Sequence, residues 1–115
     1  MALQIEHEVL GSSLAVVSLR GKLMLGQACV ELESLVPGLI SSGARHLVFD
    51  LTGLTHIDST GIGRFIDTYR RLAGTGGKVR LVGVAGAVRE SFRVTRLDTV
   101  FPIYASVDAA REGLS

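Results

Sequence analysis

The hydrophobic pattern begins with two short runs separated by turn residues. Residues 3–9 alternate as a half-buried strand does, and residues 14–21 (LAVVSLRG) form a second, more apolar run. Between them, residues 11–13 (GSS) have the composition of a turn. The two runs are therefore predicted to form an antiparallel hairpin. In the first strand, the positions expected to face inward are Leu3, Ile5 and Val9.

Two later segments change from alternation to helical spacing. Residues 27–40 and residues 60–73 each repeat apolar side chains on one helical face, with most charged residues of the second segment on the other face. Pro37 falls inside the first segment and is expected to bend or break its last turn. The expected apolar faces are Ala28, Leu32, Leu35, Val36, Leu39 and Ile40 in the first helix, and Ile62, Phe65, Ile66, Tyr69, Leu72 and Ala73 in the second.

Two nearly continuous apolar runs have the pattern of central strands that are covered on both faces. They are residues 46–51 (HLVFDL), which a short loop connects to the second helix, and residues 78–84 (KVRLVGV). The remaining expected elements are a helix over 87–95 with Val88 and Phe92 facing inward, a short strand over 100–103, and a last helix that starts at the N-cap residue Ser106 and packs through Val107, Ala110 and Leu114.

The order of these elements predicts an α/β fold in one domain that spans residues 1–115. Strands that alternate with helices imply a mostly parallel sheet, here of four to five strands, flanked by about four helices. The opening hairpin supplies an antiparallel strand at the N-terminal edge of that sheet. A chain of 115 residues has room for one hydrophobic core.

The composition excludes several classes of function. Twelve Lys and Arg residues stand against eleven Asp and Glu residues, and so weak a net charge argues against a nucleic-acid partner. Residues 1–10 lack a basic segment followed by a long apolar stretch, and no apolar run is long enough to insert into a membrane, so we expect a cytoplasmic protein. The single cysteine, Cys29, excludes an internal disulfide. His7, His46 and His56 are too scattered to suggest a metal site, and no cofactor is expected.

The segment 54–63 (LTHIDSTGIG) lies where a parallel strand feeds a helix, which is the usual place for ligands and partners in open α/β sheets. The spacing places Ser59 at or beside the N-cap of the second helix, where its hydroxyl is expected to accept from the amide of Gly61 or Ile62. Helix capping alone accounts for the polar residues. It does not account for Gly61 and Gly63, because each costs up to about 1 kcal/mol in a helix relative to alanine. A helix start without side chains lets another backbone, or an anion, approach closely.

A phosphate group on Ser59 would suit this position. It would meet free amides and the positive end of the helix dipole, and it would add about 1.5 to 2 negative charges to a nearly neutral surface. Such a modification could be accommodated without unfolding and would still repel a docked partner. The physical chemistry of the loop therefore permits a reversible switch.

Residues 47–72 (LVFDLTGLTHIDSTGIGRFIDTYRRL) resemble the core signature of STAS domains in anti-sigma-factor antagonists. The resemblance extends to the strand that ends in LRG (19–21), to GGKVRLVGV (76–84) and to the helix that follows, and so covers nearly the whole chain. It implies that Ser59 is the phosphorylation target. By the same resemblance, Asp58, Thr60 and Gly61 shape the switch loop, and the first turn of the helix, from Ile62 through Gly63 to Phe65, borders the docking face.

The resemblance also implies a set of partners. In that family the unphosphorylated protein binds an anti-sigma factor that is a serine kinase of the GHKL type, and the sigma factor is released. The kinase then phosphorylates the antagonist and dissociates, and a phosphatase of the PP2C type resets the cycle. The protein itself is expected to have no catalytic activity. A monomer or a weak homodimer is expected, with the antiparallel edge strand as one possible contact between copies.

Met24 departs from the family pattern. Many phosphorylatable members carry an aspartate in a G-x-[LIF]-D pattern after the second strand, whereas this chain reads GKLM (21–24). The departure leaves open slow phosphorylation, a kinase that supplies its own group, or a domain that docks without being phosphorylated.

Two rival functions remain. One is a non-switching STAS scaffold or accessory subunit, as in stress-sensing complexes and lipid-transport ABC systems. The other is a small nucleotide-binding protein that holds a phosphate at the 58–63 helix start.

Overall fold

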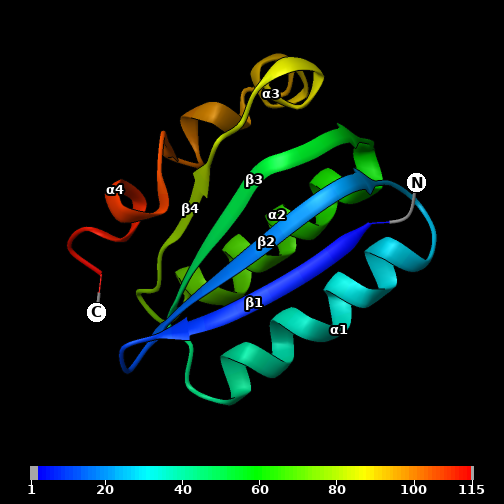
Figure 1. Ribbon diagram of the computed structural model, residues 1–115. Coiled ribbons are helices and arrows are strands. Elements are labelled where there is room, and N and C mark those ends of the chain that lie inside the picture. Colours follow the sequence, from blue (N-terminus) through cyan, green and yellow to red (C-terminus); the bar gives the residue numbers. More distant parts are fainter. Residues whose placement is uncertain (1–2, 115) are drawn as a thin grey trace.

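Strands and helices alternate along the chain in the computed structural model, which describes residues 3–114 (Figure 1). The order of the elements is the predicted one, and it confirms the α/β fold with its opening hairpin. The elements are β1 (Gln4–Leu10), β2 (Leu14–Leu23), α1 (Gln27–Ser41), β3 (His46–Ile57), α2 (Ser59–Ala73), β4 (Val79–Val82), α3 (Gly86–Val94), the 3-10 turn η1 (Leu97–Thr99), β5 (Ile103–Tyr104) and α4 (Val107–Arg111).

The five described strands form one sheet in the order β1-β2-β3-β4-β5. β1 pairs antiparallel with β2, and every other neighbouring pair is parallel. Because parallel strands share one direction, their amino ends gather at one end of the sheet and their carboxyl ends at the other. His46 begins β3 at the amino end, and Ile57 ends it beside Leu23, the last residue of β2.

The main hydrophobic core lies on one face of the sheet, where α1, α2 and α3 pack. Four phenylalanine rings form its centre, with edge-on contacts whose centroids lie 5.0 to 6.5 Å apart. Such aromatic pairs add roughly 0.5–1.5 kcal/mol each beyond their burial. The rings are Phe49 of β3, Phe65 of α2, Phe92 of α3 and Phe101.

A smaller cluster lies on the opposite face, where α4 covers part of β3 and β4 through the buried Ala110. Ser106 caps α4 as predicted, since its hydroxyl accepts from the amide of Ala109 at 3.1 Å. The cluster around α4 reaches the start of β2, where Leu14 and Val16 are buried, and Figure 1 shows the remainder of β1 and β2 (blue) lying open in front of α2. This part of the face is polar, which explains how it stays in contact with solvent.

The helix α1 continues through Pro37 to Ser41, so the predicted break at this proline was wrong. Proline removes one backbone donor from the helix ladder. Here Val36 and Leu39 are buried against the sheet on either side of Pro37, and the amide of Ser42 still donates to the carbonyl of Gly38 at 3.0 Å. Packing on both sides of the proline therefore holds the last turn in place.

The strand β3 is twice as long as predicted, because the segment interpreted as a loop after Leu51 continues as strand to Ile57. β2 is longer too, and the added residues pair with each other, for example Lys22 with His56. The added residues are mixed, since Lys22 and His56 are exposed whereas Leu23 and Leu54 are buried. The polar residues interrupt the continuous apolar pattern, so that pattern ends before the strand does. The pairing carries β2 and β3 out to the start of α2.

Three smaller expectations also differ. Val9 is 59% exposed, because it lies near the outer end of the edge strand. On α2, Tyr69 is 41% exposed and Ala73 is exposed, whereas Thr68 is buried and donates its hydroxyl to the carbonyl of Arg64. The last strand lies at Ile103–Tyr104 instead of 100–103, because the 3-10 turn η1 precedes it.

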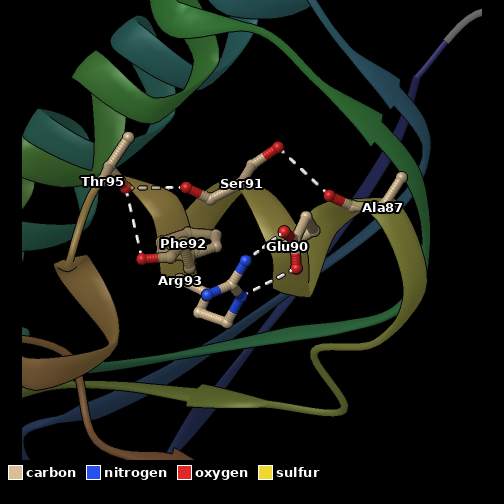
Figure 2. A network of polar contacts seen from close by, with 6 residues as sticks. All are labelled: Ala87, Glu90, Ser91, Phe92, Arg93 and Thr95. Carbon is tan, nitrogen blue, oxygen red and sulfur yellow. Dashed lines mark hydrogen bonds and ion pairs between the residues drawn. The ribbon is translucent and has the colours of Figure 1, made fainter.

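Several polar side chains on and next to the helix α3 bond to groups of the same helix, as Figure 2 shows. Arg93 pairs with Glu90 one turn earlier, and Ser91 donates to the carbonyl of Ala87 at 3.1 Å. The hydroxyl of Thr95 donates to the carbonyl of Ser91 at 2.7 Å and closes the C-terminal end. The inward positions are Val88 and Phe92, as predicted.

Candidate functional site

Asp58 caps the helix α2 at the point where β3 ends. Its backbone is extended (φ −112°, ψ −177°), and its Oδ1 accepts from the amide of Gly61 at 2.9 Å. The sequence placed Ser59 at or beside the N-cap, and Ser59 does lie beside it, but the expected bond from Gly61 goes to the carboxylate of Asp58 and not to the hydroxyl of Ser59. A carboxylate is at least as good a cap as a hydroxyl, and it also lies favourably at the positive end of the helix dipole.

The same carboxylate also holds the loop between β2 and α1. Asp58 Oδ2 accepts from the amide of Leu25 at 2.8 Å, across 33 residues of sequence. The amide of Asp58 in turn donates to the carbonyl of Leu23 at 3.3 Å. The bonds from Gly61 and then from Leu25 lower the pKa of the Asp58 carboxyl below its ordinary value, because they stabilise the charged form. One side chain thus joins the two loops at the carboxyl end of the central strands.

Replacing Asp58 with alanine is expected to lower the free energy of unfolding by about 1–2 kcal/mol, the usual cost of an N-cap. Asp58→Asn should lose less, because an amide oxygen still accepts from Gly61 while the amide nitrogen cannot accept from Leu25. Urea unfolding of the three proteins at pH 7 measures both differences. An Asp58→Asn protein as unstable as Asp58→Ala would contradict the assignment of the cap to Oδ1.

The lowered pKa of Asp58 also makes the stability of the fold depend on pH. A carboxyl whose pKa is lower in the folded state stabilises the fold above its ordinary value of 3.8, and this contribution is lost as the pH falls through the folded value. The stability difference between the wild type and Asp58→Asn should therefore narrow below about pH 4. A difference that stays constant from pH 7 to pH 3 would show that the charge of Asp58 has no part in it.

Ser59 is the first residue of α2, and its side chain is exposed. Within the described chain, residues 3–114, its hydroxyl takes part in no hydrogen bond. Thr60, the next residue, is half-buried and belongs to the first turn. With the cap provided by Asp58, the Ser59 hydroxyl has no structural task and faces solvent at the helix start.

The two glycines of the first turn have different surroundings. A Cβ on Gly61 would lie 2.5 Å from the carbonyl oxygen of Leu23 and 2.9 Å from Cγ1 of Ile57. A Cβ on Gly63 would meet nothing within 4 Å. Gly61 therefore allows α2 to approach the end of β2 closely, whereas no packing constraint explains Gly63. Only Gly63 fits the idea of a smooth surface left open for a partner.

Ile62 and Phe65, also expected near the docking face, have buried side chains that fix α2 on the sheet. Exposed apolar side chains lie in the loop that Asp58 holds and in the first turn of α1. Leu25 is 78% exposed, Met24 40% and Val30 53%. We call these three residues the apolar patch. Contiguous exposed apolar side chains are a feature of contact surfaces.

Of the three residues of the apolar patch, the sequence indicates only Met24, which departs from the family pattern. Leu25 and Val30 belong to no motif in the sequence. Leu25 follows a strand and precedes Gly26, whose φ of 132° belongs to the left-handed half of backbone space. A leucine in such a tight connection has few neighbours to bury it, which is the signal that could have identified it.

Two further contacts connect α1 with this region. Arg64 of α2 forms an ion pair with Glu33 of α1 at 2.8 Å, one turn after Val30. Cys29 is buried, and its thiol donates to the carbonyl of Met24 at 3.1 Å. Burial, followed by the nearby Asp58 carboxylate, raises the pKa of the Cys29 thiol, so the thiol stays protonated. Cys29 therefore packs as a small buried residue that supports the loop between β2 and α1.

The described residues form no group of three or more His, Cys, Asp or Glu side chains able to hold a metal ion. In the same part of the chain, no helix combines the length and the apolar character that a membrane span requires. The features at the carboxyl end of the sheet are therefore a capped helix start, an exposed hydroxyl and the apolar patch.

Comparisons with known proteins agree with this architecture. Residues 4–110 match the STAS domain family. An anti-sigma factor antagonist from Mycobacterium paratuberculosis is 25% identical with a TM-score of 0.80, and the match covers 95% of this chain and 91% of that one. The cell fate determinant SpoIIAA of Bacillus in its phosphorylated form is 18% identical (TM-score 0.75, 92% and 96% covered). A sulfate transporter family protein from Wolinella succinogenes is 14% identical (TM-score 0.74, 90% and 85% covered). The chain therefore belongs to the STAS domain family.

Proposed function

We propose that this protein is an anti-sigma-factor antagonist whose binding to its partner is switched by phosphorylation of Ser59. In its unphosphorylated form it binds an anti-sigma factor that is a GHKL-type serine kinase, and the sigma factor is released in the cytoplasm. Phosphorylation of Ser59 dissociates the complex, and a PP2C-type phosphatase restores the binding form. The protein acts by binding alone and catalyses no reaction.

The observation that carries the proposal is the exposed hydroxyl of Ser59, which has no bonding partner within residues 3–114 and lies at the first position of α2. Because this hydroxyl is exposed and holds no other group in place, it is accessible to a kinase. The similarity to antagonists from Mycobacterium and Bacillus supports the same function, and one of those structures contains the phosphorylated form.

The charge at this position explains how the switch would act. The Gly61 amide is already bonded to Asp58, so a phosphate on Ser59 would lie outside the cap and would not replace it. It would place about two more negative charges beside an existing carboxylate. The fold tolerates this, because the surface there is open to water. A partner that buries the same surface would have to desolvate both anions, which disfavours binding.

Contact with the partner would centre on the apolar patch. Leu25 and Met24 lie in the loop that Asp58 holds next to the start of α2, so a partner that covers Ser59 also covers them. Burying a leucine side chain contributes about 1.5–3 kcal/mol. The open helix surface at Gly63 would let the backbone of the partner come close.

A second candidate function has a specific observation in its favour. Met24 stands where many phosphorylatable members of the family carry an aspartate, and a sulfate transporter family protein shares the fold. Both agree with a STAS scaffold or accessory subunit that docks through the same surface without being phosphorylated. In that case the gene is expected beside one for a membrane transporter and not beside genes for a kinase and a phosphatase.

The deciding experiment is phosphorylation by the candidate GHKL-type kinase. The purified protein is mixed with the kinase and ATP and then analysed by mass spectrometry. We expect one phosphate on the peptide that contains Ser59, and none in Ser59→Ala. Thr60→Ala, which changes the neighbouring hydroxyl, serves as the matched control and should still be phosphorylated.

The binding arm of the experiment separates the two candidates. Ser59→Asp is expected to bind the kinase at least about tenfold more weakly than the wild type, because it imitates part of the phosphate charge. Tight binding without phosphate incorporation would favour the scaffold. A Ser59→Asp protein that binds as tightly as the wild type would refute repulsion as the mechanism of release.

A further inference from the structure

The edge of the sheet at β4 is incomplete on the side where β5 pairs. β5 pairs only with Leu81 and Val82 of β4. Leu81 donates its amide to the carbonyl of Pro102 at 2.9 Å, and in a parallel ladder the amide of residue 102 would next donate to the carbonyl of Val79. Proline has no amide hydrogen, so the ladder stops there.

Val79 is consequently left with outward-facing backbone groups. The amide of Leu47 donates to the carbonyl of Lys78, so even-numbered residues of β4 direct their backbone groups toward β3 and odd-numbered ones toward β5. Within residues 3–114, the N–H and C=O of Val79 have no backbone partner on that side. Unpaired backbone groups of this kind are a template for another strand.

A groove of about 420 Å³ lies along this open edge. Tyr69 and Ala73 of α2 line one side, Val100 and Pro102 line another, and β4 contributes Val79. The ring of Tyr69 stacks edge-on against Phe101 at 5.8 Å and is 41% exposed, and Val100 is 40% exposed. The groove therefore combines unpaired backbone groups with apolar walls, and its volume suits a short extended segment.

The charge beside the groove is positive. Lys78 lines it, and the guanidinium of Arg45 lies beside Gly76, another lining residue, with its Nη2 3.0 Å from the place a Cβ on that glycine would take. Neither cation forms an ion pair with any residue in the described part of the chain. Arg80, by contrast, is occupied, since it donates to the carbonyls of Ala110 and Glu112 behind the sheet.

The behaviour of His46 agrees with this concentration of charge. Its Nδ1 accepts from the amide of Lys78 at 3.0 Å, which fixes the ring next to the groove. Burial, followed by the cations Arg45, Arg80 and Lys78, lowers the pKa of His46. Of these cations, Lys78 and Arg45 lie at the groove, where an acidic partner would meet both.

We propose that this groove binds an extended acidic segment of a partner protein, which adds to the sheet along β4. The backbone of the segment would pair with the N–H and C=O of Val79, an apolar side chain would pack between Tyr69 and Val100, and a carboxylate would pair with Lys78 or Arg45. Strand addition of this type takes its affinity from main-chain bonds and its specificity from alternate side chains. The groove lies at the amino end of β3 and β4, at the opposite end from Ser59, so both surfaces can be occupied at once.

The test is an NMR titration of the isotope-labelled full chain with a capped peptide of alternating glutamate and valine. We expect saturable shifts that are largest at the amides of Lys78 and Val79, and binding that weakens as salt is added. A capped peptide of alternating lysine and valine is the control and should not bind. Absence of saturable shifts, or shifts centred on another surface, would overturn the proposal, as would equal binding of the lysine peptide.

Two lysine variants test the charge. Lys78→Glu is expected to reduce the affinity for the glutamate peptide at least about tenfold, because it replaces attraction by repulsion. Lys22→Glu makes the same change at the far end of the sheet and should leave the affinity unchanged. Equal effects of the two would overturn the assignment of the site. Concentration-dependent dimerisation that protects the Val79 amide without peptide would overturn the choice of partner, because the acidic edge strand β1 of a second copy would then be the occupant.

Discussion

Replacing Gly61 with alanine is expected to destabilise the protein by about 1–3 kcal/mol, the usual cost of overpacking. The new methyl group would lie 2.5 Å from the carbonyl oxygen of Leu23, far inside contact distance. That oxygen also accepts from the amide of Asp58, so a shift of the backbone to relieve the clash would strain a bond at the helix start as well. The better helix propensity of alanine, about 1 kcal/mol, offsets only part of this loss.

Gly63→Ala is the matched control, two residues further along the same turn. Its methyl group meets nothing within 4 Å, so the variant should gain up to about 1 kcal/mol from helix propensity alone. Thermal unfolding measures both changes, with a shift of roughly 4 °C for each kcal/mol in a domain of this size. If Gly61→Ala were as stable as the wild type, the close approach of α2 to β2 would not be a constraint.

Replacing Leu25 with serine is expected to weaken binding of the GHKL-type kinase by roughly 10- to 100-fold. The side chain is 78% exposed in the free protein, so the contact area that a partner gains by covering it is large. Losing the burial of one leucine costs about 1.5–3 kcal/mol of binding free energy. This loss corresponds to a decrease in affinity of roughly 10- to 100-fold. The amide of Leu25 remains in place, so the bond to Asp58 and the position of the loop should persist.

Val94→Ser provides the control for this prediction. Val94 is 61% exposed at the end of α3, outside the apolar patch, and its replacement should leave the affinity for the kinase unchanged. Both affinities can be measured by calorimetric titration, after thermal unfolding has shown that the variants remain folded. Equal losses in the two variants would indicate a general effect on solubility or folding. No loss in Leu25→Ser would exclude the apolar patch from the interface.

The order of the elements could be predicted from the sequence because it depends on side chains that are buried in regular alternation. Phe65 and Leu72 repeat at helical spacing, and residues 46–51 are mostly apolar, so burial and pattern coincide. The ends of the elements depend on other forces. β3 continues past Leu51 through backbone pairing with β2, and residues 52–57, where the buried Leu54 stands among exposed polar residues, carry no continuous pattern that indicates it.

The candidate site could be located from the sequence, but its internal assignments could not. The segment 58–63 contains several residues that can cap a helix, and all of them fit the same local pattern. Asp58 and Ser59 are distinguished by a partner 33 residues away, the amide of Leu25, which only the folded chain brings into reach. In the same way, the reason for Gly61 lies in the backbone of Leu23, outside the motif.

The close contact between Gly61 and Leu23 affects what the motif at residues 58–63 can reveal about a new sequence. Asp58 and Gly61 are fixed by capping and by packing, tasks that every domain built in this way has to perform. Finding these two residues in a new sequence therefore identifies the architecture and says little about regulation. Ser59 and Gly63 have no such task, so these are the positions at which regulated and unregulated relatives can differ freely. A search that weights them separately, together with the residue at position 24, would sort switches from scaffolds better than the whole motif does.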